Sequence, residues 1–436
     1  MIVNFFSTLI NKNMNNSYDI VSSSKIIVAN IIKPAIDLYQ QNKILFWQYI
    51  FFVLFIFSPR IHYFQIPGAT SDLRFDVLTM ILFGAIFVLL SLFNLRTIRF
   101  SHFSPFTWCV FAILLYISSI FILFSNNIIY ALFQIFWYAT MVFSFYLSRN
   151  LLLNLSLNSA INFLRVYINI NVVMHLSDVL NWRVFDNGRL FEATPVYDFA
   201  YGFWEQPSPF ALVIGIYTVI VLTGGFKVSR IEKIMLISSL LFCESRIGTG
   251  AFFISMILAS RYRLWFIGGS IILYFSVVFT GLNEQLKSLS FLSLMTYSKL
   301  VGDPSLRMRI GNMEAMTDWW ENSNNFIFGG GVLSHLEYSY QYGKPGPLDS
   351  FYLKMLSDFG FISCMLFVVL FVIIIVKNIN IIKLNFYVLV APVLFVAIYS
   401  LMNEGLTSIK SGHIVFFLMG LVYWNIILKR SSDSHY

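Results

Sequence analysis

The sequence predicts an all-α polytopic membrane protein with about 12 transmembrane helices and both termini in the cytoplasm. Hydrophobic residues make up 58% of the 436 residues and charged residues only 11%, whereas a soluble protein carries roughly a quarter charged residues. The mean hydropathy is +0.74, and apolar runs close to the length of a spanning helix recur along the chain. The net charge of +8 is not gathered in a basic run, and no zinc-ligand spacing occurs, so nucleic acid is excluded as a partner.

Residues 1–43 are predicted to form a cytoplasmic segment, because they begin with a polar stretch and show no cleavable signal peptide. Within this segment Lys25–Gln41 is predicted to form a helix on the membrane surface, broken at Pro34. The first spanning helix, Ile44–Ser58, would then serve as an uncleaved anchor.

Further spanning helices are expected wherever an apolar run is long enough to cross the bilayer. A weaker candidate, Ala160–Leu176, is interrupted by Asn162, Arg165 and Asn169, and Arg165 is interpreted as reaching toward the cytoplasmic surface. A short cytoplasmic tail, residues 429–436, closes the chain. The other predicted spans are Phe75–Phe93, Phe106–Phe124, Ile128–Leu147, Phe210–Gly225, Leu264–Gly281, Phe351–Val376, Phe386–Met402 and His413–Leu428.

The stretch Ile231–Ser260 is too long for one ordinary span and short for two. We interpret it as two short helices that meet at Glu244-Ser245-Arg246. This interpretation is favoured because it leaves the Lys and Arg residues of all the short connections on one side, and such residues mark the cytoplasm. Arg246 then lies at or near membrane depth, where a charge is costly and usually functional; Glu244 is the alternative, structural partner for it.

Two long segments fall on the outer side. One runs over residues 177–209 within the bundle of residues 44–281, and the other, residues 282–350, precedes the C-terminal spans in 351–428. The second is far longer than an ordinary connection of about 4 to 6 residues, and such loops are usually functional or disordered. Its aromatic residues, among them Trp319, argue against disorder. Tyr and Trp can stack on sugar rings, so these segments favour a carbohydrate site, although an interfacial aromatic belt explains part of the set.

The outer segments also carry the residues that could perform chemistry. Arg is well suited to bind a pyrophosphate through paired hydrogen bonds, and the candidates are Arg246, Arg189, Arg309, Arg307 and Arg183. The alternative for loop arginines is pairing with nearby acids. Candidate general bases are Asp349 and Glu205, then His335, Glu337 and Glu404.

Each candidate base has a structural alternative. Asp349 with Ser350 could cap the helix that begins at Phe351, and the segment after Glu205 could be a helix start capped by Ser208. The triplet Gly329-Gly330-Gly331 permits a tight turn or a close approach of backbone to a ligand. No set of residues has the spacing of a metal site, the three Cys residues are expected to be inert, and no cofactor is expected.

Together these residues resemble the O-antigen polymerase (Wzy-type) and O-antigen ligase superfamily of bacterial inner-membrane glycosyltransferases. The topology is similar over most of the chain, and the sequence is similar in a few short stretches. These are Ser245-Arg246-Ile247-Gly248, Arg189 followed by Gly202 and Pro207-Ser208-Pro209, and Arg307, Arg309, Trp319, Gly329–Gly331 and Asp349-Ser350 through Gly360. Ligases of this superfamily typically carry His-Asn where this chain has Asp349-Ser350, which favours a polymerase.

The resemblance implies a GT-C-like fold and a metal-independent glycosyltransferase that joins oligosaccharide repeat units carried on undecaprenyl pyrophosphate at the periplasmic face. Donor and acceptor would both be lipid-linked, and a regulator of chain length would be a protein partner. Under this reading Arg246, Arg189 and Arg309 bind the pyrophosphates, Arg307, Trp319 and His335 contribute to substrate binding, and Asp349 or Glu205 is the base. An O-antigen ligase and a polysaccharide-lipid flippase or secondary transporter are the alternatives.

Overall fold

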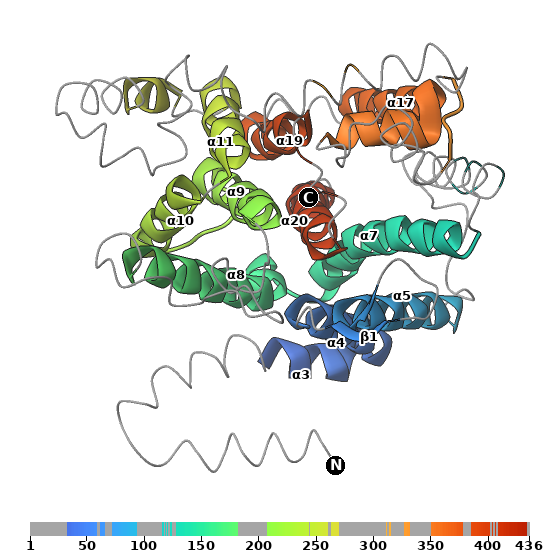
Figure 1. Ribbon diagram of the computed structural model, residues 1–436. Helices are drawn as coiled ribbons and strands as arrows, with labels where there is room; N and C mark the ends of the chain where they lie inside the picture. Colours follow the sequence, from blue (N-terminus) through green and yellow to red (C-terminus); the bar gives the residue numbers. More distant parts are fainter. Residues whose placement is uncertain are drawn as a thin grey trace.

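The computed structural model describes a helical bundle arranged around one central helix (Figure 1). The described residues are 33–58, 62–65, 72–93, 128–181, 207–243, 245–259, 263–269, 327–331, 350–377, 385–401 and 409–433, with 116, 118, 120, 123, 311, 314, 403 and 406. The central helix is α20 (Ile409–Asp433), which contacts α4, α5, α7, α8, α9 and α19.

The helices coincide with the predicted spans wherever those spans are described. They are α3 (Lys33–Gln41), α4 (Lys43–Phe57), α5 (Phe75–Phe93), α7 (Ile128–Asn154), α8 (Leu157–Val179), α9 (Pro207–Thr223), α10 (Arg230–Phe242), α11 (Arg246–Ala259), α17 (Phe351–Lys377) and α19 (Phe386–Leu401). The helical prediction is therefore confirmed. The predicted spans Phe106–Phe124 and Leu264–Gly281 lie largely outside the described residues.

One detail differs from the predictions. A short antiparallel hairpin, β1 (His62–Gln65) and β2 (Asp72–Arg74), joins α4 to α5 and was not expected. The predicted break at Pro34 stays a prediction; α3 begins at Lys33, and Pro34 lies in its first turn, where no intrahelical N–H bond is lost. The start of the predicted surface helix, residues 25–32, lies outside the described residues.

The stretch that was ambiguous in sequence forms two short helices, as predicted. Cys243 ends α10, and the hydroxyl of Ser245 accepts a hydrogen bond from the backbone N–H of Gly248 in the first turn of α11. The Thr249 hydroxyl donates to the carbonyl of Leu240 at 2.9 Å and ties the two helices together at the corner. Both helices pack on α9, α10 together with α8 and α11 together with α19 (Figure 1).

Side-chain contacts fix the directions of α4 and α7 relative to α20. The rings of Phe55 and His413 lie 4.8 Å apart, and those of Phe52 and Phe417 lie 4.9 Å apart, so α4 and α20 are antiparallel. Thr140 contacts His413 near the start of α20, whereas Arg149 lies over the ring of Trp424 near its end. The helices α7 and α20 are therefore parallel.

A second set of contacts fixes α9 and α19. The hydroxyl of Tyr399, near the end of α19, donates to the carbonyl of Ser208 in the first turn of α9. At the other end of this pair, a Cβ on Gly225 would lie 3.4 Å from Val388, near the start of α19. The two helices are thus antiparallel, and the end of α19 lies beside the start of α20, where Leu406 closely approaches Gly412.

These directions bring basic residues of distant segments to one end of the bundle. We call it the basic end; the opposite end is where α4 and α19 end and α9 and α20 begin. With α10 and α11 as separate helices, the sequence prediction placed the same residues together. The described Lys and Arg residues at the basic end include Lys43, Arg149, Lys227, Arg230, Lys233 and Lys429.

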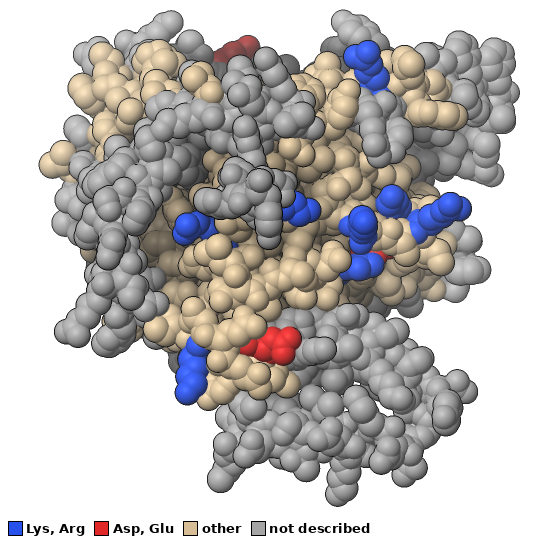
Figure 2. All heavy atoms as spheres, turned by 180° about the vertical axis from the view of Figure 1, so that it is seen from behind, with Lys and Arg blue, Asp and Glu red and all other residues tan. Residues whose placement is uncertain are grey.

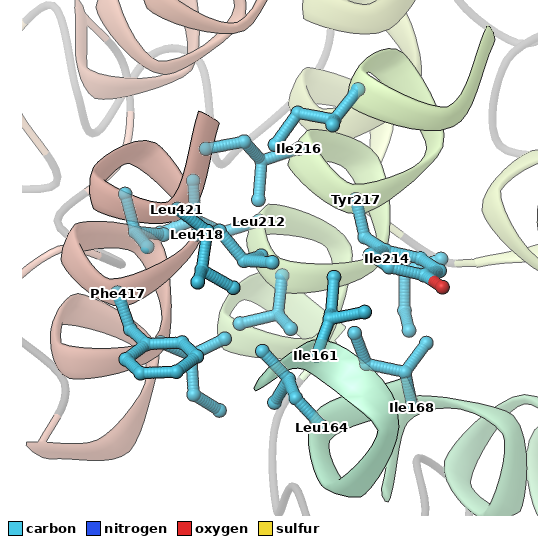
Figure 3. Close-up of a cluster of buried hydrophobic side chains, with 14 of the residues drawn as sticks. Ile161, Leu164, Ile168, Leu212, Ile214, Ile216, Tyr217, Phe417, Leu418 and Leu421 are labelled. Atoms are coloured by element: carbon cyan, nitrogen blue, oxygen red, sulfur yellow. The ribbon is translucent and has the colours of Figure 1, made fainter. Parts of the chain in front are cut away.

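The core lies between α20 and its neighbours, and α9 is its most enclosed element (Figure 3). Nearly every residue of α9 from Phe210 to Val221 is fully buried. The helix is therefore apolar around its whole circumference and packed against neighbours on all sides. Leu212, Leu418 and Leu164 come from α9, α20 and α8 and meet in this core.

Among the described residues, α20 between Lys410 and Lys429 is the helix long and apolar enough to cross a membrane by itself. Shorter apolar helices accompany it in α4, α5, α9, α11 and α19. Large apolar side chains are exposed on the surface, for example Trp265 at 81% and Ile231 at 71%, and the described surface seen in Figure 2 is largely uncharged. These features are compatible with a membrane protein; passage through the bilayer about 12 times stays a prediction.

Close packing of α7 against α20 depends on small residues, as is common between membrane helices. A Cβ on Gly420 would lie 2.8 Å from the carbonyl oxygen of Phe145 and would collide with the hydroxyl of Ser148. We expect Gly420→Ala to lower the free energy of unfolding by about 1–3 kcal/mol through overpacking. The matched control is Gly250→Ala in α11, where a Cβ meets nothing within 4 Å.

The control should change stability in the other direction, by about 0.5–1 kcal/mol, because Ala is the better helix former. Denaturant unfolding in one detergent, with both variants side by side, measures the difference. Equal stability of the two variants would contradict the proposed packing of α7 on α20.

Candidate functional site

A lysine is buried at the opposite end of the bundle, in the first turn of α20. Lys410 is only 4% exposed, and its ammonium donates a hydrogen bond to the backbone carbonyl of Ser58, the residue that ends α4. Burial of an ammonium group is costly unless polar groups or opposite charges surround it. A buried lysine at a helix end is therefore a strong candidate for function.

His413 projects from the same side of α20, because residues three apart on a helix share a face. Its Nε2 lies 2.8 Å from the hydroxyl oxygen of Thr140, and that hydroxyl lies 2.8 Å from the carbonyl of Trp137. A hydroxyl has one hydrogen to donate, and a carbonyl can only accept. If Thr140 donates to the carbonyl of Trp137, then His413 donates to the Thr140 hydroxyl through Nε2; the direction of this contact depends on the tautomer of the ring.

Ser58 joins the lysine to two further helices. Its hydroxyl donates to the carbonyl of Phe55 at 2.6 Å and accepts from the hydroxyl of Thr79 in α5 at 3.0 Å. The residues Lys410, His413, Ser58, Thr79 and Thr140 thus link α4, α5, α7 and α20, and we call them the Lys410 cluster. Four of the five lie within helices and Ser58 caps the end of α4; helices hold side chains more precisely than loops do.

A second polar junction lies at the same end, between α9 and α19. The amide of Asn403 donates to the hydroxyl of Ser208 at 2.8 Å, and Tyr399 donates to the carbonyl of the same residue at 2.5 Å. Ser208 was considered as a helix cap; instead it is the second residue of α9, and its side chain receives Asn403. This junction fixes the start of α9 at the end of the bundle that holds the Lys410 cluster.

The basic end holds a charged cluster of a different kind. Arg165 of α8 forms an ion pair with Glu232, with Nε lying 3.0 and 3.1 Å from the two carboxylate oxygens. Asn169 and the Tyr217 hydroxyl also donate to Glu232, at 3.4 and 3.3 Å. We call these four residues the Glu232 cluster. Arg165, expected to reach toward the cytoplasmic surface, is therefore paired, and it joins α8 to α10.

The two clusters lie at different depths of one bundle. On α9, Ser208 and Tyr217 are nine residues apart, which corresponds to about 14 Å along a helix. The first is at the level of the junction with Asn403, and the second contacts Glu232. The Glu232 cluster is thus separated along the bundle axis from the end that holds the Lys410 cluster.

Most residues predicted to carry chemistry lie outside the described residues. This applies to Asp349, Glu205, Arg189, Arg309, Arg307, Trp319, His335, Arg183, Glu337, Glu404 and Glu244. Arg246 begins α11, and its side chain is outside the described set. Ser350 does cap α17, since its hydroxyl accepts from the N–H of Leu353 at 3.4 Å. That the predicted site residues lie close to one another therefore remains a prediction.

Sequence reasoning missed Lys410 and His413. The signal was available, because Lys410 is a basic residue at the end of a span where the positive-inside pattern predicts the outer face. Of the three cysteines, Cys243 is buried and Cys364 partly buried, neither of them in a disulfide, and Cys109 is outside the described residues.

The described residues contain no group of His, Cys, Asp and Glu that could hold a metal ion. The chemical resources of the Lys410 cluster are a buried cation, a buried imidazole and several hydroxyl groups. Such a set can bind an anion and orient hydroxyl groups. No family model matches this chain, and no curated protein matches it either.

Proposed function

We propose that this protein is a polytopic inner-membrane glycosyltransferase that polymerises oligosaccharide repeat units carried on undecaprenyl pyrophosphate. The product would be O-antigen or a related surface polysaccharide. The observation that carries the proposal is the buried ammonium of Lys410 at one end of a helical bundle, in a chain whose long polar segments carry further arginines and aromatic residues.

The direction of the bundle supports an external site. Lys and Arg residues of short connections mark the cytoplasmic side of a membrane protein, and the basic end gathers Lys43, Arg149, Arg230 and Lys429. Lys410 and Lys429 are 19 residues apart on α20, about 29 Å, which is close to the thickness of the hydrocarbon layer. Lys410 would then lie at the outer boundary of the bilayer, where a lipid pyrophosphate resides.

The chemistry of the proposed reaction explains why a cation is needed there. Transfer of a glycan from a lipid carrier breaks the bond between the sugar and its pyrophosphate, and negative charge accumulates on the departing pyrophosphate. A fixed cation in a dry site stabilises such charge far more than it would in water. Lys410 would contribute this stabilisation together with the predicted Arg246, Arg189 and Arg309.

The acceptor hydroxyl must lose its proton to a base as the new glycosidic bond forms. Asp349 is the first candidate and Glu205 the second, and His335, Arg307 and Trp319 would contribute to substrate binding. The proton passes to the carboxylate and later to water. The proposed reaction uses no cofactor. A chain-length regulator is the protein partner that this function would require.

The test is the surface polysaccharide of a strain that lacks the gene, complemented with the wild-type chain. A polymerase predicts that the deletion strain shows lipid A core bearing single repeat units and that complementation restores long chains. Accumulation of long chains on the lipid carrier, with none on the core, would instead identify a ligase. Normal long chains in the deletion strain would reject both enzymes and favour a flippase or transporter.

A further inference from the structure

Helix α17 is interrupted at Gly360, and a glycine-rich turn of the preceding long segment is seated in the interruption. Gly360 has φ +74°, which breaks the helix nine residues after its start at Phe351. The turn contains residues 327–331, in which Gly329 and Gly331 have φ values of +81° and +87°. Non-Gly residues rarely adopt such angles, so these glycines are required by the conformation itself.

Backbone hydrogen bonds join the two segments. Gly330 N–H donates to the carbonyl of Ser357 at 2.9 Å, and Gly331 N–H donates to that of Asp358 at 3.1 Å. In the reverse direction Ile362 N–H donates to the carbonyl of Ile327 at 3.2 Å. The carbonyls released by the break in α17 thus receive donors from the turn, which satisfies groups that would otherwise be costly to bury.

The contact is too close for side chains. A Cβ on Gly329 would lie 2.6 Å from the carbonyl oxygen of Asp358 and 2.6 Å from the backbone nitrogen of Gly360. A Cβ on Gly360 would collide with Ile327, Phe328 and Gly329. We call this junction, residues 327–331 against 357–362, the glycine seat.

The position of the glycine seat gives it a mechanical role. From Gly360 to Lys377 the helix is about 25 Å long, which is nearly enough to cross the hydrocarbon layer. The seat would therefore lie near the outer boundary of this layer. The chain leaves the seat at Gly331 and returns to the same helix at Ser350. Residues 332–349 are therefore tied at both ends to the first turns of α17, and they include His335 and Asp349.

Helix α17 is in turn fixed to the bundle. The Tyr352 hydroxyl donates to the carbonyl of Ala397 in α19 at 3.3 Å, and the Tyr116 hydroxyl donates to that of Phe359 at 3.4 Å. Phe359 also packs edge-on against Tyr138 of α7, with ring centroids 6.0 Å apart. A group tied to α17 is thereby tied to the helices that carry the Lys410 cluster.

We infer that the glycine seat is a fixed positioning device that keeps residues 327–331 joined to α17 throughout the reaction and so anchors both ends of the intervening segment, residues 332–349, to this helix. This inference rests on the proposed function for the identity of the reaction, but the seat itself can be tested without it. The glycine residues act through the segment they anchor and are positioning residues.

The experiment is a disulfide across the seat. In the full-length protein with Cys109, Cys243 and Cys364 replaced by Ser, Ile327→Cys and Ile362→Cys are introduced, because their backbones are directly hydrogen-bonded. Mild oxidation should cross-link this pair almost completely. The control pair, Ile327→Cys with Val376→Cys near the other end of α17, should not cross-link.

Polymer formation is then compared before and after oxidation. A fixed seat predicts that the cross-linked protein keeps its activity within about twofold. Gly330→Pro lacks the N–H that is bonded to Ser357 and should lose activity by at least about tenfold. The same disulfide should restore activity to the Gly330→Pro protein. Loss of activity on cross-linking, reversed by reductant, would overturn the inference, since the seat would then have to open. Failure to cross-link would overturn it as well.

The two hypotheses fail in different ways. If the wild-type chain makes no polymer, the proposed function is rejected, while the cross-linking yields still report on the seat. If the wild-type chain makes polymer but the cross-link does not form, the seat is rejected and the proposed function stands.

Discussion

Replacing Lys410 by Met should reduce polymer formation by at least about 100-fold, because it removes a buried cation from the place where we propose that negative charge develops. Met has a similar length and is apolar, so it should occupy the same space between α4 and α20. The substitution leaves the carbonyl of Ser58 without this donor, which should cost only about 1–3 kcal/mol of stability. The measurement is the ladder of chain lengths made by the deletion strain complemented with each variant.

The controls separate charge from folding. Lys410→Arg keeps a cation and should retain more activity than Lys410→Met. Lys429→Met removes a lysine from the exposed, basic end of the same helix and should leave the ladder unchanged. Each variant must be present in the membrane at the wild-type level. A Lys410→Met protein that is abundant and makes normal long chains would remove Lys410 from the site.

The second large effect is expected at the Glu232 cluster, and it concerns stability. Arg165→Ala should lower the free energy of unfolding by about 3 kcal/mol, because it leaves a buried carboxylate without its cation. Glu232→Gln should cost less, about 1–2 kcal/mol, since Gln keeps acceptors for Asn169 and Tyr217. Moreover, Arg165 is 34% exposed on its side chain and can return to water, whereas Glu232 is 8% exposed.

A double-mutant cycle measures the coupling directly. The double variant Arg165→Ala, Glu232→Gln should be less destabilised than the sum of the two single variants, because no unpaired charge remains. Arg230→Ala, exposed on the same helix as Glu232, is the matched control and should change stability by no more than about 0.5 kcal/mol. Additive effects of the two single substitutions would show that the ion pair contributes no coupling energy.

The helical elements were predictable because hydrophobic length alone specifies a spanning helix. Phe75–Phe93 was predicted with both ends correct, and Phe386–Met402 differs from α19 by one residue. The corner at Ser245 was predictable because the polar residues Glu244-Ser245-Arg246 interrupt an apolar run that is too long for one span. Such features are local, and the sequence contains all the information needed to place them.

The contacts between distant segments could not be predicted in this way. Nothing near Arg165 in the sequence indicates that Glu232 is its partner, since the ion pair depends on how α8 and α10 pack on α9. The pattern of the resembled superfamily has a helix that ends near Gly360, but the segment that packs against this glycine could not be predicted, because an isolated Gly is also tolerated within an apolar helix. The structural reason for the glycine is the close approach of the backbone of Gly329 to Gly360.

For the candidate site, the sequence pointed to residues of the long polar segments rather than to residues of the helices. Sequence reasoning favoured residues in long polar segments, such as Asp349 and Arg309, because loops commonly carry function. The bundle itself contributes Lys410 and His413, which were passed over because they lie at the edge of a span. Both sets belong to the proposed site, and they would meet at the outer end of the bundle.

The most direct test of the account is reconstitution of the purified protein in liposomes with repeat units linked to undecaprenyl pyrophosphate. A polymerase should convert single units into a ladder of longer glycans, without nucleotide sugar or added metal, and the Lys410→Met protein should not. The contradicting result is that repeat units remain single with a folded wild-type protein present, whether or not they are moved across the bilayer.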